Sequence, residues 1–325
     1  MKKILFTSPG RRVELINFFK IQNNFLLYGA DYINTSPASF YLEKVFELPF
    51  KIDKKYIEKI LNICEENNID LVIPLIDPEI PLLSNYEEEF SKIQTKLLIP
   101  NKDICQKSFD KLEMSKEIRK IKVKQPKTIS MNDIEKLENI NTENIIIKPK
   151  TGSSSKNVFK LKKDVVKDFI KLMDFCLDDF IIQEYIDYEF EVTVDVFSDF
   201  EGNIVEMCQR KRLKTRGGEV ERAVTMKDKK LAKIVEKISK ELKINSIFNI
   251  QFLYSNNNYY FLEINPRFGG GYPLSHKSGA NFIENINNFI ENKPYNYYKS
   301  SRYIDNYYML RYDNAIYTKE LKKLC

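Results

Sequence analysis

The chain has 325 residues, of which 43% are hydrophobic and 30% charged, and its formal net charge is +6. This length suggests about two domains, and the apolar fraction is too high for a disordered chain. The charge excess is spread along the chain, so it favours anionic ligands in general but does not indicate a nucleic-acid interface. The single histidine excludes a multi-histidine metal centre, and the five scattered cysteines argue against a disulfide framework or structural zinc.

The first apolar run ends at Phe6, before the polar stretch 7–12, and is too short for the hydrophobic region of a signal peptide. No later apolar stretch is long enough to span a membrane. Widely spaced cysteines fit a reducing compartment. We therefore expect a cytoplasmic protein with neither a membrane nor a nucleic-acid partner.

The first hundred residues alternate short apolar runs with helical patterns. We predict strands at 4–7, 26–28, 45–48, 71–74 and 96–99, and helices at 13–19, 54–67 and 79–91. This alternation predicts a doubly wound parallel sheet, which binds ligands at the carboxyl ends of its strands. Here those ends are 8–12, Asp31 and 76–79. No G-x-G-x-x-G follows the first strand, so a nicotinamide cofactor is not expected.

From about residue 107 the pattern changes to longer strands with fewer helices. We predict helices at 108–121 and 227–242, and strands at 145–149, 180–183, 191–197, 204–211, 248–254 and 259–264. The last two strands read as a hairpin that turns at 256–258. The fold class is therefore an α/β domain followed by an α+β domain.

Two lysines stand at the ends of predicted elements. Lys111 lies at the start of a helix, and Lys148 ends a strand just before a loop of small residues. The loop comprises Gly152, Ser153, Ser154, Ser155 and Lys156. Two ammonium groups can neutralise phosphate oxygens, and small residues allow backbone N–H groups to approach a phosphate closely. The pattern indicates a nucleotide triphosphate site.

A second group of residues suits a metal ion. Glu263 and Asn265 are two apart on a predicted strand, so their side chains leave the same face, and Gln251 on the partner strand adds a third oxygen. Carboxylate and amide oxygens suit Mg²⁺ or Mn²⁺. Arg267 continues this register and would stabilise charge on a transferring γ-phosphoryl group.

In this order the motifs resemble those of the ATP-grasp superfamily, which includes D-alanine–D-alanine ligase, biotin carboxylase and the large subunit of carbamoyl phosphate synthetase. The resemblance implies an ATP-grasp domain at 106–295, with a lid at about 120–183, after a pre-ATP-grasp domain at 1–105; 296–325 would be a closing segment. It implies that Lys111, Lys148 and the loop from Gly152 bind the phosphates of ATP. It implies that Glu184, Tyr185 and Ile186 bind adenine and that Glu191, or the nearby Glu189, binds ribose. Glutamine at the first metal position, Gln251, is as in the carbamoyl phosphate synthetase branch, and this leaves open whether one or two metals bind.

Other candidates are less specific. In the basic run 210–212, either Lys211 or Arg212 points to the γ-phosphate, or the run is an exposed edge strand. The glycines Gly269, Gly270 and Gly271 permit unusual backbone conformations and could place N–H groups around a substrate carboxylate. His276 is either a general base or part of a polar wall. Arg11 and Arg12, at a helix start, either bind an anionic substrate or are solvated.

The function implied is an ATP-dependent carboxylate–amine ligase that forms an amide through an acyl phosphate and releases ADP and phosphate. Its partners would be a small-molecule carboxylate and an amine, and the resemblance allows a homodimer. The first alternative is a small-molecule kinase or carbamoyl-phosphate-type enzyme that stops at phosphoryl transfer. The second is a nucleotide-binding protein without turnover.

Overall fold

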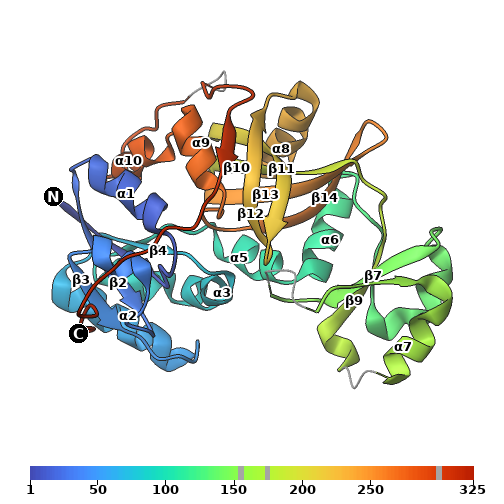
Figure 1. Ribbon diagram of the computed structural model, residues 1–325, viewed down its shortest axis with the longest axis horizontal. Helices are drawn as coiled ribbons and strands as arrows, with labels where there is room; N and C mark the ends of the chain where they lie inside the picture. Colours follow the sequence, from blue (N-terminus) through green and yellow to red (C-terminus); the bar gives the residue numbers. More distant parts are fainter. Residues whose placement is uncertain (153–156, 173–175, 298–301) are drawn as a thin grey trace.

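The computed structural model describes residues 1–152, 157–172, 176–297 and 302–325. The N-terminal part is a parallel sheet with strand order β3-β2-β1-β4-β5, flanked by helices (Figure 1). Its strands are β1 (Lys2–Thr7), β2 (Phe25–Asp31), β3 (Lys44–Glu47), β4 (Leu71–Pro74) and β5 (Lys96–Leu97), and its longer helices are α1 (Val13–Ile21) and α2 (Lys54–Asn67). This is the doubly wound sheet that the sequence predicts.

Two predicted elements of this part differ from the structure. Instead of one helix at 79–91, the chain forms two short α-helices, α3 (Ile80–Leu83) and α4 (Glu87–Lys92). A 3₁₀ turn precedes each of them. Pro81 lies at the start of α3, where its missing N–H is tolerated, but a proline in the interior of a longer helix would break the hydrogen-bond ladder. The predicted strand at 96–99 is reduced to the two residues of β5.

The central layer is a six-stranded antiparallel sheet with strand order β14-β13-β10-β11-β12-β15. Its strands are β10 (Phe190–Ser198), β11 (Ile204–Arg216), β12 (Glu219–Met226), β13 (Ser246–Ser255), β14 (Asn258–Asn265) and β15 (Tyr308–Leu310), and α8 (Lys229–Glu241) packs on it. Asn256 and Asn257 both have positive φ, as a two-residue hairpin turn between β13 and β14 requires. The predicted hairpin is therefore confirmed.

A third, four-stranded sheet has the order β6-β9-β7-β8 and lies at the opposite end of the molecule from the parallel sheet (Figure 1). Its strands are β6 (Thr128–Ser130), β7 (Asn144–Pro149), β8 (Phe159–Lys162) and β9 (Phe180–Glu184), with α7 (Val166–Leu172) beside them. The helix predicted at 108–121 is two helices, α5 (Lys102–Phe109) and α6 (Lys111–Lys120). Asp110 between them is extended, and its carboxylate caps α6 by accepting hydrogen bonds from the backbone N–H groups of Leu112 and Glu113.

One hydrophobic core joins the parallel sheet to the central part of the chain. Phe19 of α1 packs against Phe268, and Phe268 packs against Tyr272 of α9 (Tyr272–Ser278), which precedes α10 (Ile286–Ile290). In the described part of the chain, no helix combines the length and the apolarity needed to cross a membrane. This core and the ion pair of Arg267 with Asp77 hold the loops after β1 and β4 against the loop that follows β14.

Candidate functional site

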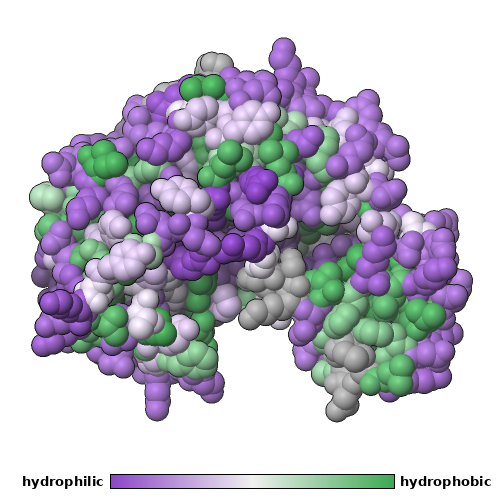
Figure 2. Space-filling view, viewed as in Figure 1, coloured by the Kyte–Doolittle hydropathy of each residue, from purple (hydrophilic) through white to green (hydrophobic). Residues whose placement is uncertain are grey.

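A cleft of about 800 Å³ lies where the three sheets meet. The central sheet supplies one wall, the third sheet another, and the loops after β1 and β4 close one end. Figure 2 shows the surface hollowed between the part that carries the third sheet and the rest of the molecule. The cleft brings together most of the predicted site residues, namely Arg12, Lys111, Lys148, Gly152, Glu184, Tyr185, Ile186, Glu191, Arg212, Gln251, Glu263, Asn265, Arg267, Gly269, Gly270 and Gly271.

The strand register of the central sheet aligns the polar side chains of this wall. Gln251 of β13 is directly opposite Glu263 of β14, and on its other side it is opposite Thr193 of β10. Thr193 in turn is opposite Arg210 of β11. Residues opposite each other in an antiparallel sheet project from the same face, so this row crosses four strands and faces the cleft.

The amides and the carboxylate at one end of this row are in contact. Asn265 Nδ2 donates hydrogen bonds to Glu263 Oε1 and to Asn249 Oδ1, each at 3.2 Å, and Gln251 Oε1 accepts from Arg212 at 2.9 Å. Among the described residues, no three His, Cys, Asp or Glu side chains form a metal-binding group. The donor set is thus one carboxylate with two amides, all hard oxygen ligands, and it fits a Mg²⁺ ion that takes its remaining ligands from phosphates and water.

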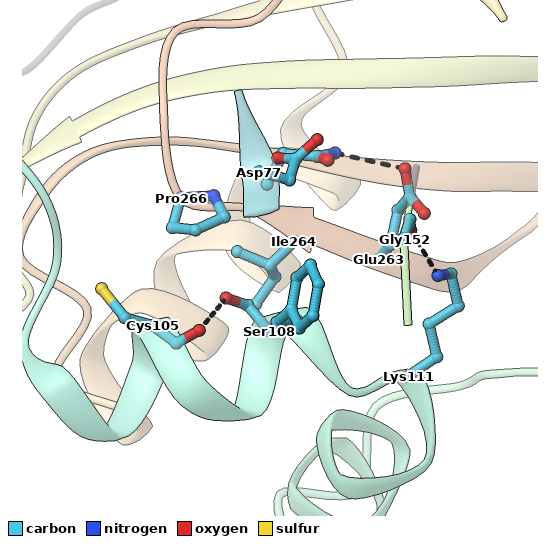
Figure 3. A pocket seen from close by; sticks show the side chains of 10 residues that line it. Asp77, Cys105, Ser108, Lys111, Gly152, Glu263, Ile264 and Pro266 are labelled. Atoms are coloured by element: carbon cyan, nitrogen blue, oxygen red, sulfur yellow. Dashed lines mark hydrogen bonds between the residues drawn. The ribbon is translucent and has the colours of Figure 1, made fainter. Parts of the chain in front are cut away.

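Both predicted lysines face this end of the cleft. Lys148 Nζ donates to Gln183 Oε1 at 2.9 Å, and burial lowers the Lys148 pKa to about 8, an effect that the nearby Glu263 partly opposes. Lys111 Nζ donates to the backbone carbonyl of Gly152 at 2.7 Å, and burial lowers its pKa too. Figure 3 shows Lys111 and Glu263 on either side of Gly152 in a small pocket that Asp77 also lines. Among the described residues, neither ammonium group forms an ion pair with a carboxylate, which suits an anionic ligand.

The predicted adenine and ribose positions lie along the opposite rim. Glu184 is tied to the backbone, since its Oε2 accepts from the Lys127 N–H at 3.0 Å. Glu191 lines the cleft and forms an ion pair with Arg212 at 2.9 Å. Glu189 instead accepts a hydrogen bond from Asn256 N in the hairpin turn and does not line the cleft. Of the two acids, Glu191 is therefore the one that lines the cleft.

The basic run on β11 divides between the two faces of the sheet. Arg210 and Arg212 line the cleft, whereas Lys211 does not. The Lys211 ammonium lies 3.9 Å from the centre of the Phe190 ring. Because side chains alternate along a strand, Lys211 cannot share the face of its two neighbours. Of the two candidates for the γ-phosphate, only Arg212 therefore lines the cleft.

The loop after β14 is built around two buried or half-buried ion pairs. Arg267 donates to Asp77, which follows β4, at 2.5 Å. Arg210 forms a two-pronged pair with Asp195 at 2.7 and 3.0 Å. Asp77 belongs to the segment 76–79, which the sequence predicts at a ligand-binding carboxyl end of the parallel sheet, but its pairing with Arg267 was not predicted.

The three glycines of this loop are required for space rather than for backbone freedom. None of Gly269, Gly270 and Gly271 is among the positive-φ glycines of the described chain. The expectation that they adopt unusual backbone conformations is therefore wrong. A Cβ at Gly271 would overlap the Arg210 guanidinium, and one at Gly270 would come within 2.7 Å of Arg12 Nη1. The loop therefore packs directly on two guanidinium groups.

Two predicted substrate residues lie outside the cleft. His276 stacks on Phe18 at 3.9 Å between ring centroids, and burial lowers its pKa to about 4, so it is a packed neutral ring and not a base in this site. The Arg11 side chain is 79% exposed and lies 4.0 Å from Asp313. Ser153, Ser154 and Ser155 of the predicted phosphate loop fall outside the described residues.

A doubly wound parallel sheet, followed by two antiparallel sheets that enclose such a cleft, defines the ATP-grasp fold, and the chain has this fold. Two family models match it. Residues 4–98 match the PylC-like, N-terminal domain, and residues 177–304 match the family described as ATP-grasp in the biosynthetic pathway with Ter operon. Lys111 and Lys148 lie between these two matches. No curated protein sequence matches the chain.

Solved structures share the fold at low sequence identity. The biotin carboxylase domain of 2-oxoglutarate carboxylase from Hydrogenobacter thermophilus, in complex with MgADP, ADP and bicarbonate, has a TM-score of 0.75 at 13% identity, covering 94% of this chain and 73% of that one. N5-carboxyaminoimidazole synthetase from Staphylococcus aureus has a TM-score of 0.69 at 16% identity, covering 90% and 78%. The biotin carboxylase subunit of pyruvate carboxylase has a TM-score of 0.64 at 14% identity, covering 95% and 74%.

Proposed function

We propose that this protein is an ATP-dependent carboxylate–amine ligase, which couples a small acid to a small amine and releases ADP and phosphate. The observation that carries the proposal is the convergence on one cleft of Lys111 from α6, Lys148 from β7, and Glu263 and Arg267 from β14 and the loop after it. Two lines of similarity support it. The structurally similar biotin carboxylase domain is in complex with MgADP, and a synthetase shares the fold.

The residues of the cleft divide into binding roles. Lys111 and Lys148 would neutralise phosphate oxygens of ATP, and the loop that begins at Gly152 would cover them. Tyr185 and Ile186 would contact adenine, and Glu184, bound to the Lys127 N–H, would hold this segment in place. Glu191 would accept hydrogen bonds from the ribose hydroxyls. We propose the corresponding chain division into 1–105, 106–295 with a lid at about 120–183, and 296–325.

Gln251, Glu263 and Asn265 would hold a magnesium ion, which supplies charge neutralisation and orientation of the phosphates when it is bound. The single carboxylate among these three is sufficient for Mg²⁺, since phosphates and water commonly complete its shell. Arg212 donates to Gln251 at 2.9 Å, which supports a role for its guanidinium at the same phosphates.

The chemistry proceeds in two displacements. A carboxylate oxygen of the acid attacks the γ-phosphorus, and the bond to the β,γ-bridging oxygen breaks, which gives an acyl phosphate and ADP. The amine nitrogen then attacks the acyl carbon, phosphate leaves with the former carboxylate oxygen, and the nitrogen loses a proton. Arg267 and Arg212 stabilise the negative charge of both steps, and exclusion of water from the cleft protects the acyl phosphate.

A screen of acids, each offered with and without a mixture of amines, tests the proposal by ADP release. We expect ADP release that depends on one acid and rises with an amine, and an amide as the product. Glu263→Gln should abolish the activity, whereas Glu201→Gln, in an exposed turn, should keep it. A stable phosphorylated product would favour a kinase, and no acid-dependent turnover would contradict the proposal.

A further inference from the structure

Arg12 has an unusual environment for an arginine in a binding cleft. Its side chain is only 20% exposed, and its guanidinium lies against the backbone of Gly270, so close that any side chain at position 270 would crowd it. Within the described ranges its one ion pair is with Glu219, at 3.7 Å, which is beyond hydrogen-bond distance. Among the described residues its guanidinium makes no hydrogen bond to the protein, although it carries five N–H donors.

The other arginines that line the cleft are each tied down. Arg210 binds Asp195 with two hydrogen bonds, Arg267 binds Asp77 at 2.5 Å, and Arg212 binds Gln251 and the Gly218 carbonyl. Their guanidinium groups hold the walls of the cleft in place. The donors of Arg12 are free to bind a ligand.

The charges around Arg12 do not balance. Glu219 is shared, because its other oxygen lies 3.5 Å from Arg311, and Arg311 itself donates to the carbonyls of Gly270 and Val220 behind the loop. Asp77 is already paired with Arg267. One carboxylate thus serves two guanidinium groups, which leaves about one unit of positive charge at this end of the cleft. Burial and the repulsion from Arg267 lower the Arg12 pKa to about 10. An incoming anion would offset this repulsion.

The position of Arg12 relative to the reacting groups is also informative. Arg267 lies in the loop directly after β14, the strand that carries Glu263 and Asn265, and the reacting carboxylate of the acid must lie near these residues if the proposed function holds. Arg12 comes from the loop after β1 and reaches the same cleft next to Gly270, near enough to Arg267 for the two guanidinium groups to repel each other. A short molecule with an anionic group at each end would satisfy both arginines.

We propose that the acid substrate carries a second anionic group, a carboxylate or a phosphate, and that Arg12 binds this group while the first carboxylate reacts beside Arg267. This inference rests on the proposed function for the identity of the reacting carboxylate. The planar guanidinium, with parallel N–H donors, suits the two oxygens of either anion. Arg12 is then the residue that selects a dianionic acid over its neutral-ended analogue.

Binding of matched probes tests the selection directly. Isothermal titration of the protein saturated with MgADP would compare glutarate, its half-amide glutaramate, and 3-phosphonopropionate. Wild type should bind at least one dianion at least about tenfold more tightly than glutaramate, as expected for a charge-assisted hydrogen-bonded pair. Arg12→Gln should lose this preference, and Arg12→Lys should keep part of it. Arg11→Gln removes the same charge from the neighbouring exposed residue and should change nothing.

The affinity for MgADP, measured in each variant, verifies that the cleft is still folded. The better dianion distinguishes a carboxylate from a phosphate as the second group. Equal binding of glutarate, phosphonopropionate and glutaramate, an absence of dianion binding, or a preference that survives in Arg12→Gln would overturn the inference. Dianion binding that depends on Arg12, without acid-dependent ADP release, would contradict the proposed function and leave the anion site standing.

Discussion

Lys148 and Gln183 lie on the paired strands β7 and β9, and the ammonium of Lys148 donates a hydrogen bond to the Gln183 amide oxygen at 2.9 Å. A neutral amide orients the buried ammonium but does not neutralise it. Burial therefore lowers the Lys148 pKa to about 8, with Glu263 acting in the opposite direction. The charge is available at neutral pH for a ligand that brings its own negative charge.

The affinity for MgADP should fall as the pH rises through about 8, because the free protein then loses the Lys148 proton. Between pH 7 and 9.5 we expect a loss of about tenfold in affinity for wild type. Lys148→Arg stays protonated over this range and should lose much less. Titration calorimetry at the two pH values measures both, and equal losses in the two proteins would contradict the assignment.

Removal of the same lysine should have opposite effects on stability and on binding. The folded protein holds Lys148 with a pKa below that of the unfolded chain, so the group reduces stability at pH 7, and this cost disappears as the pH rises from about 8 towards 10.5. Lys148→Met should therefore be more resistant to urea than wild type at pH 7, with a free energy of unfolding that is larger by about 1–2 kcal/mol. It should also lose MgADP binding. A less stable variant would show that the ammonium is structural.

The two acids of the predicted ribose position form a matched pair. Glu191 lines the cleft, whereas Glu189 binds the hairpin turn at Asn256. Loss of a hydrogen bond to a charged acceptor costs about 1.5–3 kcal/mol, so Glu191→Gln should weaken MgADP binding about tenfold or more. Glu189→Gln should stay within about twofold. The reverse order would assign the ribose to Glu189.

Neighbouring cations on β11 should differ in the same way. Arg212 contacts Gln251 in the cleft, and Lys211 covers Phe190 on the other face. In the ADP-release assay, Arg212→Gln should lower kcat by about 100-fold, the usual loss when a preorganised charge donor is removed. Lys211→Gln should keep kcat within about twofold of wild type. Equal losses of kcat in the two variants would show that catalysis depends on the total charge of β11 and not on the face of the sheet from which a cation projects.

The buried pair of Arg210 and Asp195 should support the glycine loop. Arg210 is 1% exposed, and its removal leaves the buried Asp195 carboxylate without its cationic partner, with only the Ser275 hydroxyl still donating to it. Arg210→Met should lower the free energy of unfolding by about 3–5 kcal/mol. Arg216→Met removes an exposed pair with Asp313 and should cost less than about 1 kcal/mol. Urea unfolding compares them, and similar midpoints would contradict the role of Arg210.

The pattern of apolar residues was sufficient for elements that depend on local sequence. The parallel sheet, the helix 54–67 and the hairpin at 256–258 follow from it, since each depends on residues close together in the sequence. The oxygen ligands Gln251 and Glu263 could also be placed, because a hairpin fixes which residues are opposite each other.

Contacts between distant segments could not be read in this way. Asp77 meets Arg267 across 190 positions, and nothing local in either segment signals the pair. The face of Lys211 depends on the register between β10 and β11, which the basic run itself does not reveal. His276 has a polar sequence context, but α9 turns it onto Phe18 in the adjoining core. The structure therefore corrected the residues whose environment comes from other parts of the chain.

The central claim is that ATP activates a carboxylate in this cleft, and isotope transfer measures that step itself. The acid that supports ADP release is prepared with ¹⁸O in its carboxylate, and the released phosphate is analysed by mass spectrometry after turnover with amine. We expect one ¹⁸O atom in each phosphate, because the carboxylate oxygen leaves with it. Unlabelled phosphate, with all the ¹⁸O retained in the organic product, would contradict the account.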